Sequence, residues 1–245
     1  MRRRLRSICW AGAVACLFGA VQTSWGQENI APLGTGFLGY AAADDNTRGT
    51  DYDHASTGAG AGSVNDSNMA TRSDTWGGTA SDVPYDYVGV EWGGPISSQI
   101  DSVRLTMATF FDGGWFGAGG AGAGRALTIA DLAPEPRVQI SVDGTGWFDI
   151  PSTNNYASQM LGHNIGGDAF PNPSTSPTVE FNFEAISNIS GIRLFGEGGG
   201  NAGDDSGGFL GVYEFEVYTT PEPASGSLLC GALLLGLGFV RRIRR

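Results

Sequence analysis

The stretch Val212-Tyr213-Glu214-Phe215-Glu216-Val217-Tyr218 decides the fold class that we expect for this chain. Its side chains alternate strictly, with Tyr213, Phe215 and Val217 on one face and the two glutamates and Tyr218 on the other. A period of two is typical of a β-strand that buries one face. The sequence therefore predicts a strand here, packed against a core by its apolar face.

Five earlier runs of β-forming residues share this character and are separated by Gly, Asp, Asn and Pro. They are Tyr87–Trp92, Ser102–Met107, Arg137–Val142, Val179–Phe183 and Gly191–Phe195. Between Gln27 and Thr220 no apolar repeat of helical period reaches a convincing length. Many short strands joined by glycine-rich turns predict an all-β fold, a single antiparallel β-sandwich.

The charge of the chain excludes one class of partner. The 245 residues include no lysine and carry a formal net charge of −11, and between Gln27 and Thr220 six arginines stand against 24 acids. Such a surface offers nothing to phosphates, so we expect no nucleic-acid partner. It is soluble and can accept divalent cations. Hydrophobic residues make up 41% of the chain, enough for a packed core.

Residues 1–26 have the features of a secretory signal peptide. Four arginines at positions 2, 3, 4 and 6 precede the apolar run Ile8–Val21, and Ser24 and Gly26 stand before a cut at Gln27. An arginine-rich start, a short apolar helix and small residues at the cut direct a chain to the Sec export machinery. An N-terminal membrane anchor is the alternative, although the run is short for a span.

The last residues, 221–245, form a second apolar segment with a basic end. They begin with Pro221, Glu222 and Pro223, continue as the apolar run Ala224–Val240, and end in Arg241, Arg242, Ile243, Arg244 and Arg245. The run of 17 residues is about 26 Å long as a helix, near the lower limit for a single transmembrane helix. Basic residues at both ends of the chain favour the cytoplasmic side, so the middle is expected outside.

This tail resembles the PEP-CTERM sorting signal of Gram-negative bacteria, since the triplet, the short span and the arginine cluster occur in that order at the terminus. The resemblance implies recognition by an exosortase, removal of the tail, and delivery of residues 27–220 to the cell surface or extracellular matrix. Until it is processed, the C-terminal helix would anchor the chain in the membrane. A plain tail anchor is the alternative, and only the Pro-Glu-Pro triplet separates the two.

The cysteines lie outside the segment that we expect to be exported. Cys9 and Cys16 belong to the signal and Cys230 to the tail, so residues 27–220 contain none. The exported domain is therefore expected to be held by its own core and without disulfides.

Several motifs of the middle segment resemble a discoidin-like (galactose-binding-like) jelly roll, and they occur in the same order. They are an opening strand at Asn29–Gly36, a loop Asn65-Asp66-Ser67-Asn68 followed by Thr71-Arg72 and Trp76, the strand Tyr87–Trp92, the hairpin Val138–Trp147 with Asp143-Gly144 at its turn, and the closing pair within Ile192–Tyr218. The chain departs from the family at Ser67, where glycine is usual.

The resemblance implies one structural Ca²⁺ near this loop. Carried onto the matching positions, its side-chain ligands would be Asp66, Asn68, Thr71 and Glu214, with backbone carbonyls completing the shell. Hard oxygen donors on an acidic domain suit calcium. The alternative is that Asp66 and Asn68 only cap a turn and that Glu214 faces solvent.

The resemblance also implies a ligand site in loops at one end of the sandwich, where an aromatic ring often faces a sugar. The candidates are Trp76, Trp115 and Phe116, and Asp112-Gly113-Gly114-Trp115-Phe116 is the most suggestive run because glycines flank its aromatic residues. The alternative for Trp76, like Trp92 and Trp147, is a place in the core.

Catalysis finds no support in the sequence. His54 and His163 lack metal-ligand spacing, and no Gly-x-Ser-x-Gly motif occurs. The sequence therefore predicts an exported, non-catalytic surface or matrix protein whose sandwich binds carbohydrate. The alternative is a purely structural matrix protein with no specific ligand.

Overall fold

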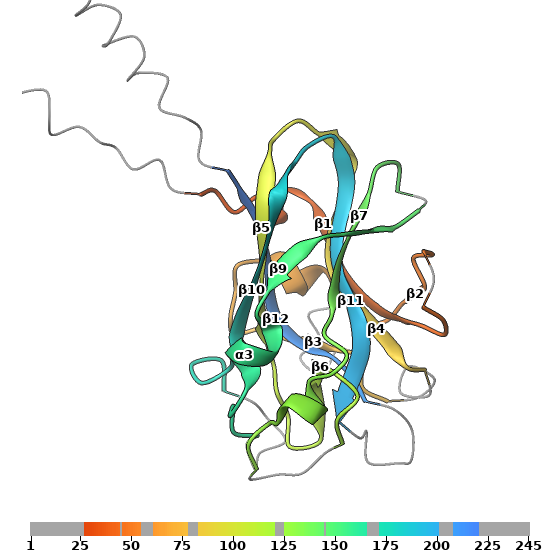
Figure 1. Cartoon of the computed structure of the whole chain (residues 1–245). Coiled ribbons are helices and arrows are strands. Elements are labelled where there is room, and N and C mark those ends of the chain that lie inside the picture. The colour runs from red at the N-terminus through yellow and green to blue at the C-terminus, as the bar shows by residue number, and fades with distance from the viewer. Residues whose placement is uncertain are drawn as a thin grey trace, which may run out of the picture. The chain divides into compact units, whose positions relative to one another are not determined.

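The computed structural model describes residues 27–44, 46–54, 61–77, 83–120, 125–144, 146–165, 172–200 and 208–220 (Figure 1). The strands in these ranges are β1 (Thr35–Ala41), β2 (Thr50–Asp51), β3 (Ser73–Asp74), β4 (Tyr85–Ile96), β5 (Ile100–Met107), β6 (Gly113–Phe116), β7 (Arg137–Ser141), β8 (Phe148–Ile150), β9 (Ser152–Asn154), β10 (Thr178–Ile186), β11 (Ile189–Gly200) and β12 (Gly211–Thr219). The helical elements are the 3-10 turns η1 (Ala31–Leu33), η2 (Ala61–Asn65) and η3 (Ile129–Asp131) and the short helix α3 (Tyr156–Met160).

The strands form two antiparallel sheets that lie face to face (Figure 1). The larger sheet has the order β2-β1-β4-β11-β7-β8, with β6 paired to the far end of β11, and the smaller sheet has the order β3-β12-β5-β10-β9. Neighbours in the sheets come from distant parts of the sequence, as where β4 lies between β1 and β11. The predicted all-β antiparallel sandwich is therefore confirmed for the described residues.

The core fills the space between the sheets with fully buried aliphatic and aromatic side chains. Leu38 and Val88 of the larger sheet belong to the same cluster as Leu105, Phe215 and Val217 of the smaller one. Burial of this kind stabilises a domain by roughly 25 cal/mol for each Å² of apolar surface removed from water.

All six predicted strands exist, but two sequence details differ in the structure. The segment Asn29–Gly36 is not one strand: η1 occupies its centre, with Pro32 in its first turn, and β1 begins only at Thr35. In β12 the strict alternation fails at Glu214, which is buried beside Tyr213. The pairing of β12 with β5 shifts register between Val212 and Glu214, which breaks the simple two-residue period.

The outer face of the larger sheet carries a second, smaller cluster centred on Arg193 of β11. The guanidinium of Arg193 is fully buried, with its carbon 4.5 Å from the centre of the Trp147 ring. It donates hydrogen bonds to the carbonyls of Thr47 and Arg48 and to Oε1 of Gln139. A buried cation with three oxygen partners and aromatic faces holds the loop before β2 against the sheet.

The two ends of the described chain lie side by side. The backbone N–H of Thr219 donates to the carbonyl of Glu28 at 3.0 Å, so the sandwich begins and ends at one place. Glu28–Thr220 forms one compact unit of its own. The predicted signal helix and C-terminal transmembrane helix lie outside the described residues. Within the described ranges, no helix has the length and apolar character that a membrane crossing requires.

Candidate functional site

The four predicted calcium ligands come together in the fold, although Glu214 is distant from the other three in sequence. Asp66 Oδ1 accepts a 2.8 Å hydrogen bond from the backbone N–H of Asn68, and the Thr71 hydroxyl lies 3.2 Å from Asp66 Oδ2. Glu214 Oε1 accepts a 3.1 Å bond from the backbone N–H of Ser67. We call residues 66–71 together with Glu214 the Glu214 loop cluster.

Glu214 is the buried member of this cluster, with 4% of its surface exposed. Its second oxygen, Oε2, has no hydrogen-bond partner. Burial raises the pKa of the Glu214 carboxyl to about 7, and the negative charges of Asp66 and Glu216 act in the same direction, while the Ser67 N–H opposes them. A buried carboxylate with an unused oxygen near a second carboxylate has the chemistry of a divalent-cation ligand.

The structure also contains contacts expected from the alternative, in which Asp66 and Asn68 only cap a turn. Asp66 and Asn68 cap backbone N–H groups of Asn68 and Ala70, as turn residues do. Glu214, in contrast, does not face solvent. Among the described residues no group of three His, Cys, Asp or Glu side chains is placed to hold a metal. Calcium would therefore need the amide and hydroxyl oxygens of Asn68 and Thr71 and backbone carbonyls as well.

Ser67 adopts a backbone conformation that is unusual for its residue type. Its φ is +59°, in the left-handed region that favours glycine. This is the position at which the resemblance leads us to expect glycine. The loop therefore keeps the tight turn with serine, at a local conformational cost.

The prediction that Trp115 and Phe116 offer a ring to a sugar is wrong, because both side chains are fully buried. Both lie in β6, which pairs with the end of β11. The Trp115 ring lies against Gly199, where an added Cβ would come within 2.2 Å of its Nε1. The backbone of Phe116 exchanges hydrogen bonds with the Tyr156 hydroxyl. The glycines of this region thus allow close packing of the rings instead of exposing them.

Trp76 is partly exposed: part of its ring packs against other side chains, and part remains on the surface. It packs against the small cluster of Ala108, Phe110, Phe209 and Tyr213. One edge contacts the His54 ring, with 4.9 Å between the ring centres. Trp92 and Trp147 are buried, as the core alternative predicted. Of the three aromatic candidates, Trp76 alone keeps surface on which a sugar could stack.

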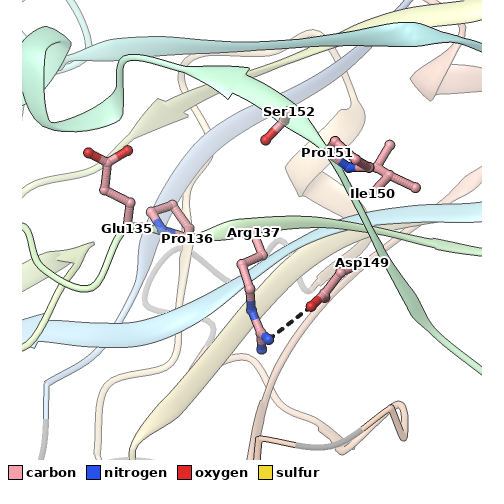
Figure 2. Close-up of a pocket in the computed structure, with 7 residues that line it drawn as sticks. All are labelled: Glu135, Pro136, Arg137, Asp149, Ile150, Pro151 and Ser152. Carbon is pink, nitrogen blue, oxygen red and sulfur yellow. Dashed lines mark hydrogen bonds and ion pairs between the residues drawn. The ribbon is translucent and has the colours of Figure 1, made fainter.

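A pocket of 470 Å³ lies beside β7 and β8, where the sequence predicted no site (Figure 2). Its lining combines polar and apolar side chains, namely Glu135, Pro136, Arg137, Asp149, Ile150, Pro151 and Ser152. The volume falls within the range of about 300–1,000 Å³ that is usual for small-molecule sites. Figure 2 shows Glu135 and Ser152 on the side away from the Arg137–Asp149 pair.

Arg137 is held firmly on one side of this pocket. Its guanidinium pairs with Asp149 at 3.0 Å and with Asp44, and it lies over the Phe195 ring. Gln139 donates a further 2.7 Å bond to Asp149. The Arg137 and Asp149 side chains are therefore positioned before any ligand arrives. The signal in the sequence was weak, because only the β7–β8 pairing places Asp149 opposite Gln139.

The predicted sorting residues, Pro221 to Pro223 and the terminal arginines, lie outside the described residues, so their arrangement remains a prediction from sequence.

No family model matches the sequence, and no curated protein is similar to it. Solved structures do show similarity. A chain of the β-galactosidase BgaA of Streptococcus pneumoniae is 12% identical with a TM-score of 0.44, and the match covers 80% of this chain and 100% of that one. A CBM32 module of a family 31 glycoside hydrolase from Clostridium perfringens is 11% identical with a TM-score of 0.42, covering 78% and 95%. An F5/8 type C domain from Bacteroides fragilis is 14% identical with a TM-score of 0.37, covering 80% and 96%. At these values the similarity assigns no ligand to this chain.

Proposed function

We propose that this chain is an exported, non-catalytic protein of the cell surface or extracellular matrix, and that its sandwich binds carbohydrate. The observation that carries the proposal is the 470 Å³ pocket beside β7 and β8. Its carboxylate, guanidinium and hydroxyl groups stand next to proline and isoleucine surfaces (Figure 2). Sugars carry hydroxyl groups around an apolar ring face, so an open surface pocket with a mixed lining suits them.

Export and sorting rest on the two ends of the sequence. The signal peptide 1–26 would pass the chain to the Sec machinery, and the tail 221–245 would hold it in the membrane until an exosortase acts. Replacing Pro221, Glu222 and Pro223 by alanine tests this directly. A variant retained in the membrane fraction supports sorting through the triplet, whereas unchanged release contradicts it.

Calcium at the Glu214 loop cluster is the second part of the proposal. The buried, unpartnered Oε2 of Glu214 and the nearby Asp66 support it, with Asn68 and Thr71 as further oxygen donors. The ion would join the loop to β12 and offset the buried negative charge. Its role in this proposal is structural, so the pocket beside β7 would bind its ligand without direct metal contact.

A purely structural matrix role is the second candidate. The complete burial of Trp115 and Phe116 favours it, because these rings cannot stack on a sugar. The two functions differ in one measurable property, the presence of a saturable glycan site.

The experiment is calorimetric titration of the segment Glu28–Thr220, which contains both sheets and the core, with neutral, cationic and anionic oligosaccharides. Each titration is run with Ca²⁺ and with chelator. Ser152→Phe fills the pocket and is expected to abolish binding, while Ser98→Phe, in the exposed connection between β4 and β5, is the matched control. If none of the oligosaccharides binds, with Ca²⁺ or with chelator, the result would favour the structural role.

A further inference from the structure

Every cationic side chain between Glu28 and Thr220 is already engaged within the fold. Four of the six arginines form ion pairs: Arg48 with Asp51 and Glu91, Arg104 with Glu180 and Glu216, Arg125 with Asp131, and Arg137 with Asp44 and Asp149. Arg72 lies over the Phe110 ring, and Arg193 is buried. The two histidines contact Asp74 and Thr109.

The segments of this domain outside the described ranges do not change that balance, because they add aspartates and no Arg, Lys or His. The four ion-paired arginines stay partly exposed, but each already faces at least one carboxylate, so a carboxylated or sulfated sugar would have to compete with these carboxylates for the positive charge. The loss of hydration of its anionic groups would not be offset, and repulsion from the acidic surface would slow its approach. This charge pattern selects against anionic polysaccharides.

The pocket beside β7 has the same excess of carboxylates over cations. Asp44 and Asp149 neutralise Arg137 twice over. Glu135 is exposed at the other side of the pocket (Figure 2). None of the ion pairs among the described residues includes it. The pocket therefore holds a net negative charge, with one carboxylate open to a ligand.

We propose that this pocket takes an amine-bearing saccharide, with the protonated amino group of the sugar paired to Glu135. The proposal rests on the carbohydrate-binding function above and names the ligand class of that site. The Arg137–Asp149 pair would hydrogen-bond sugar hydroxyls, and Pro136, Pro151 and Ile150 would contact the apolar ring face. A charge-assisted bond is about twice as strong as a neutral one, which makes the amine the discriminating group.

The test compares three oligosaccharides of equal length, namely a β-1,4-linked glucosamine oligomer, its N-acetylated counterpart and a uronic acid oligomer. Binding to the segment Glu28–Thr220 is measured by calorimetry at mildly acidic pH, where the amines are protonated. We expect the amine oligomer to bind about tenfold more tightly than the acetylated one, which corresponds to ~1.4 kcal/mol. When chelator is present, we expect the uronic acid oligomer not to bind.

Two variants locate the effect. Glu135→Gln is expected to remove the tenfold preference, whereas Glu184→Gln, which removes an exposed carboxylate on β10, is expected to keep it. An equal loss in both variants would indicate general attraction to an acidic protein and overturn the proposal. Equal affinity for amine and acetylated oligomers would overturn it as well, while leaving carbohydrate binding intact. Binding of none of the three would overturn both the proposed function and this inference.

Discussion

The backbone N–H of Ser67 donates a 3.1 Å hydrogen bond to Glu214 Oε1, although the two residues are 147 positions apart in the sequence. This bond holds the loop 66–71 against β12. It satisfies one oxygen of a buried carboxylate and leaves the other, Oε2, without a partner. The loop and the strand together thus present oxygen donors that are positioned but incompletely satisfied, which a divalent cation would complete.

Calcium is expected to raise the melting temperature of the segment Glu28–Thr220, and chelator to reverse the shift. At a concentration a hundredfold above the dissociation constant, binding adds about 2.7 kcal/mol. For a domain of this size that corresponds to roughly 5–10 °C. Differential scanning calorimetry with and without the ion measures it.

The Glu214→Gln variant is expected to lose this shift because it removes the buried charged ligand. Glu184→Gln removes a carboxylate of the same type from an exposed position and should keep the full shift. A calcium shift of equal size in Glu214→Gln would mean that the ion binds elsewhere, and the ligand assignment would then be wrong.

Ser67→Gly is expected to be more stable than Ser67→Ala by about 1 kcal/mol, since a left-handed φ costs a residue with a Cβ roughly 1–2 kcal/mol and glycine little. The Ser67 φ of +59° is the relevant observation. Both variants retain the N–H that bonds to Glu214, so the comparison isolates the backbone effect. Urea denaturation of the pair measures it, and equal stability would contradict it.

Trp115→Ala is expected to destabilise the domain by about 3–5 kcal/mol, as for other fully buried large aromatic residues. Any loss of ligand binding in this variant would follow from unfolding. Trp115→Phe should cost much less, because the indole N–H makes no hydrogen bond that the change could remove. Chemical denaturation of both variants, alongside Trp76→Ala at the partly exposed ring, separates a packing role from a surface role.

The buried carboxyl of Asp86 is expected to make the stability of the domain depend on pH. Burial raises its pKa well above 3.8, and the nearby Thr75 hydroxyl opposes this only in part. The Thr75 hydroxyl lies close enough to act on the charge, but its geometry makes no hydrogen bond to either carboxyl oxygen. Because the folded pKa lies above the unfolded value, the stability contributed by the neutral form is complete below the unfolded pKa. It is lost as the pH rises through the folded pKa.

Asp86→Asn keeps the shape of the side chain and stays neutral. We expect it to be more stable than the original chain at neutral pH, with the difference closing as the pH falls toward about 4. Thermal unfolding across this pH range measures the difference, and Glu184→Gln should follow the unaltered chain throughout. If Asp86→Asn is less stable than the original chain at every pH, then ionisation of Asp86 does not destabilise the folded domain.

The secondary structure of this protein could largely be predicted from its sequence, because strand periodicity is a local property. The alternation of Phe215 and Val217 with polar residues, and the β-forming runs before them, predicted strands that the structure contains. The resemblance to discoidin-like domains also implied that the loop of Asp66 lies near Glu214, and the structure joins them through the N–H of Ser67. The assignments of the two ends, at 1–26 and 221–245, remain predictions from sequence motifs, charge and the resemblance of the tail to a PEP-CTERM signal.

Burial and charge pairing were decided only by the tertiary structure. Glycines beside Trp115 in the sequence suggest an exposed ring, but pairing of β6 with β11 places this ring against Gly199, which leaves room for it because it has no Cβ. Likewise, Asp44 and Asp149 reach Arg137 only because β7, β8 and the loop before β2 lie together on one sheet. Local periodicity determines which face of a strand is apolar, whereas the partner that covers the face, or neutralises the charge, comes from residues far away in the chain.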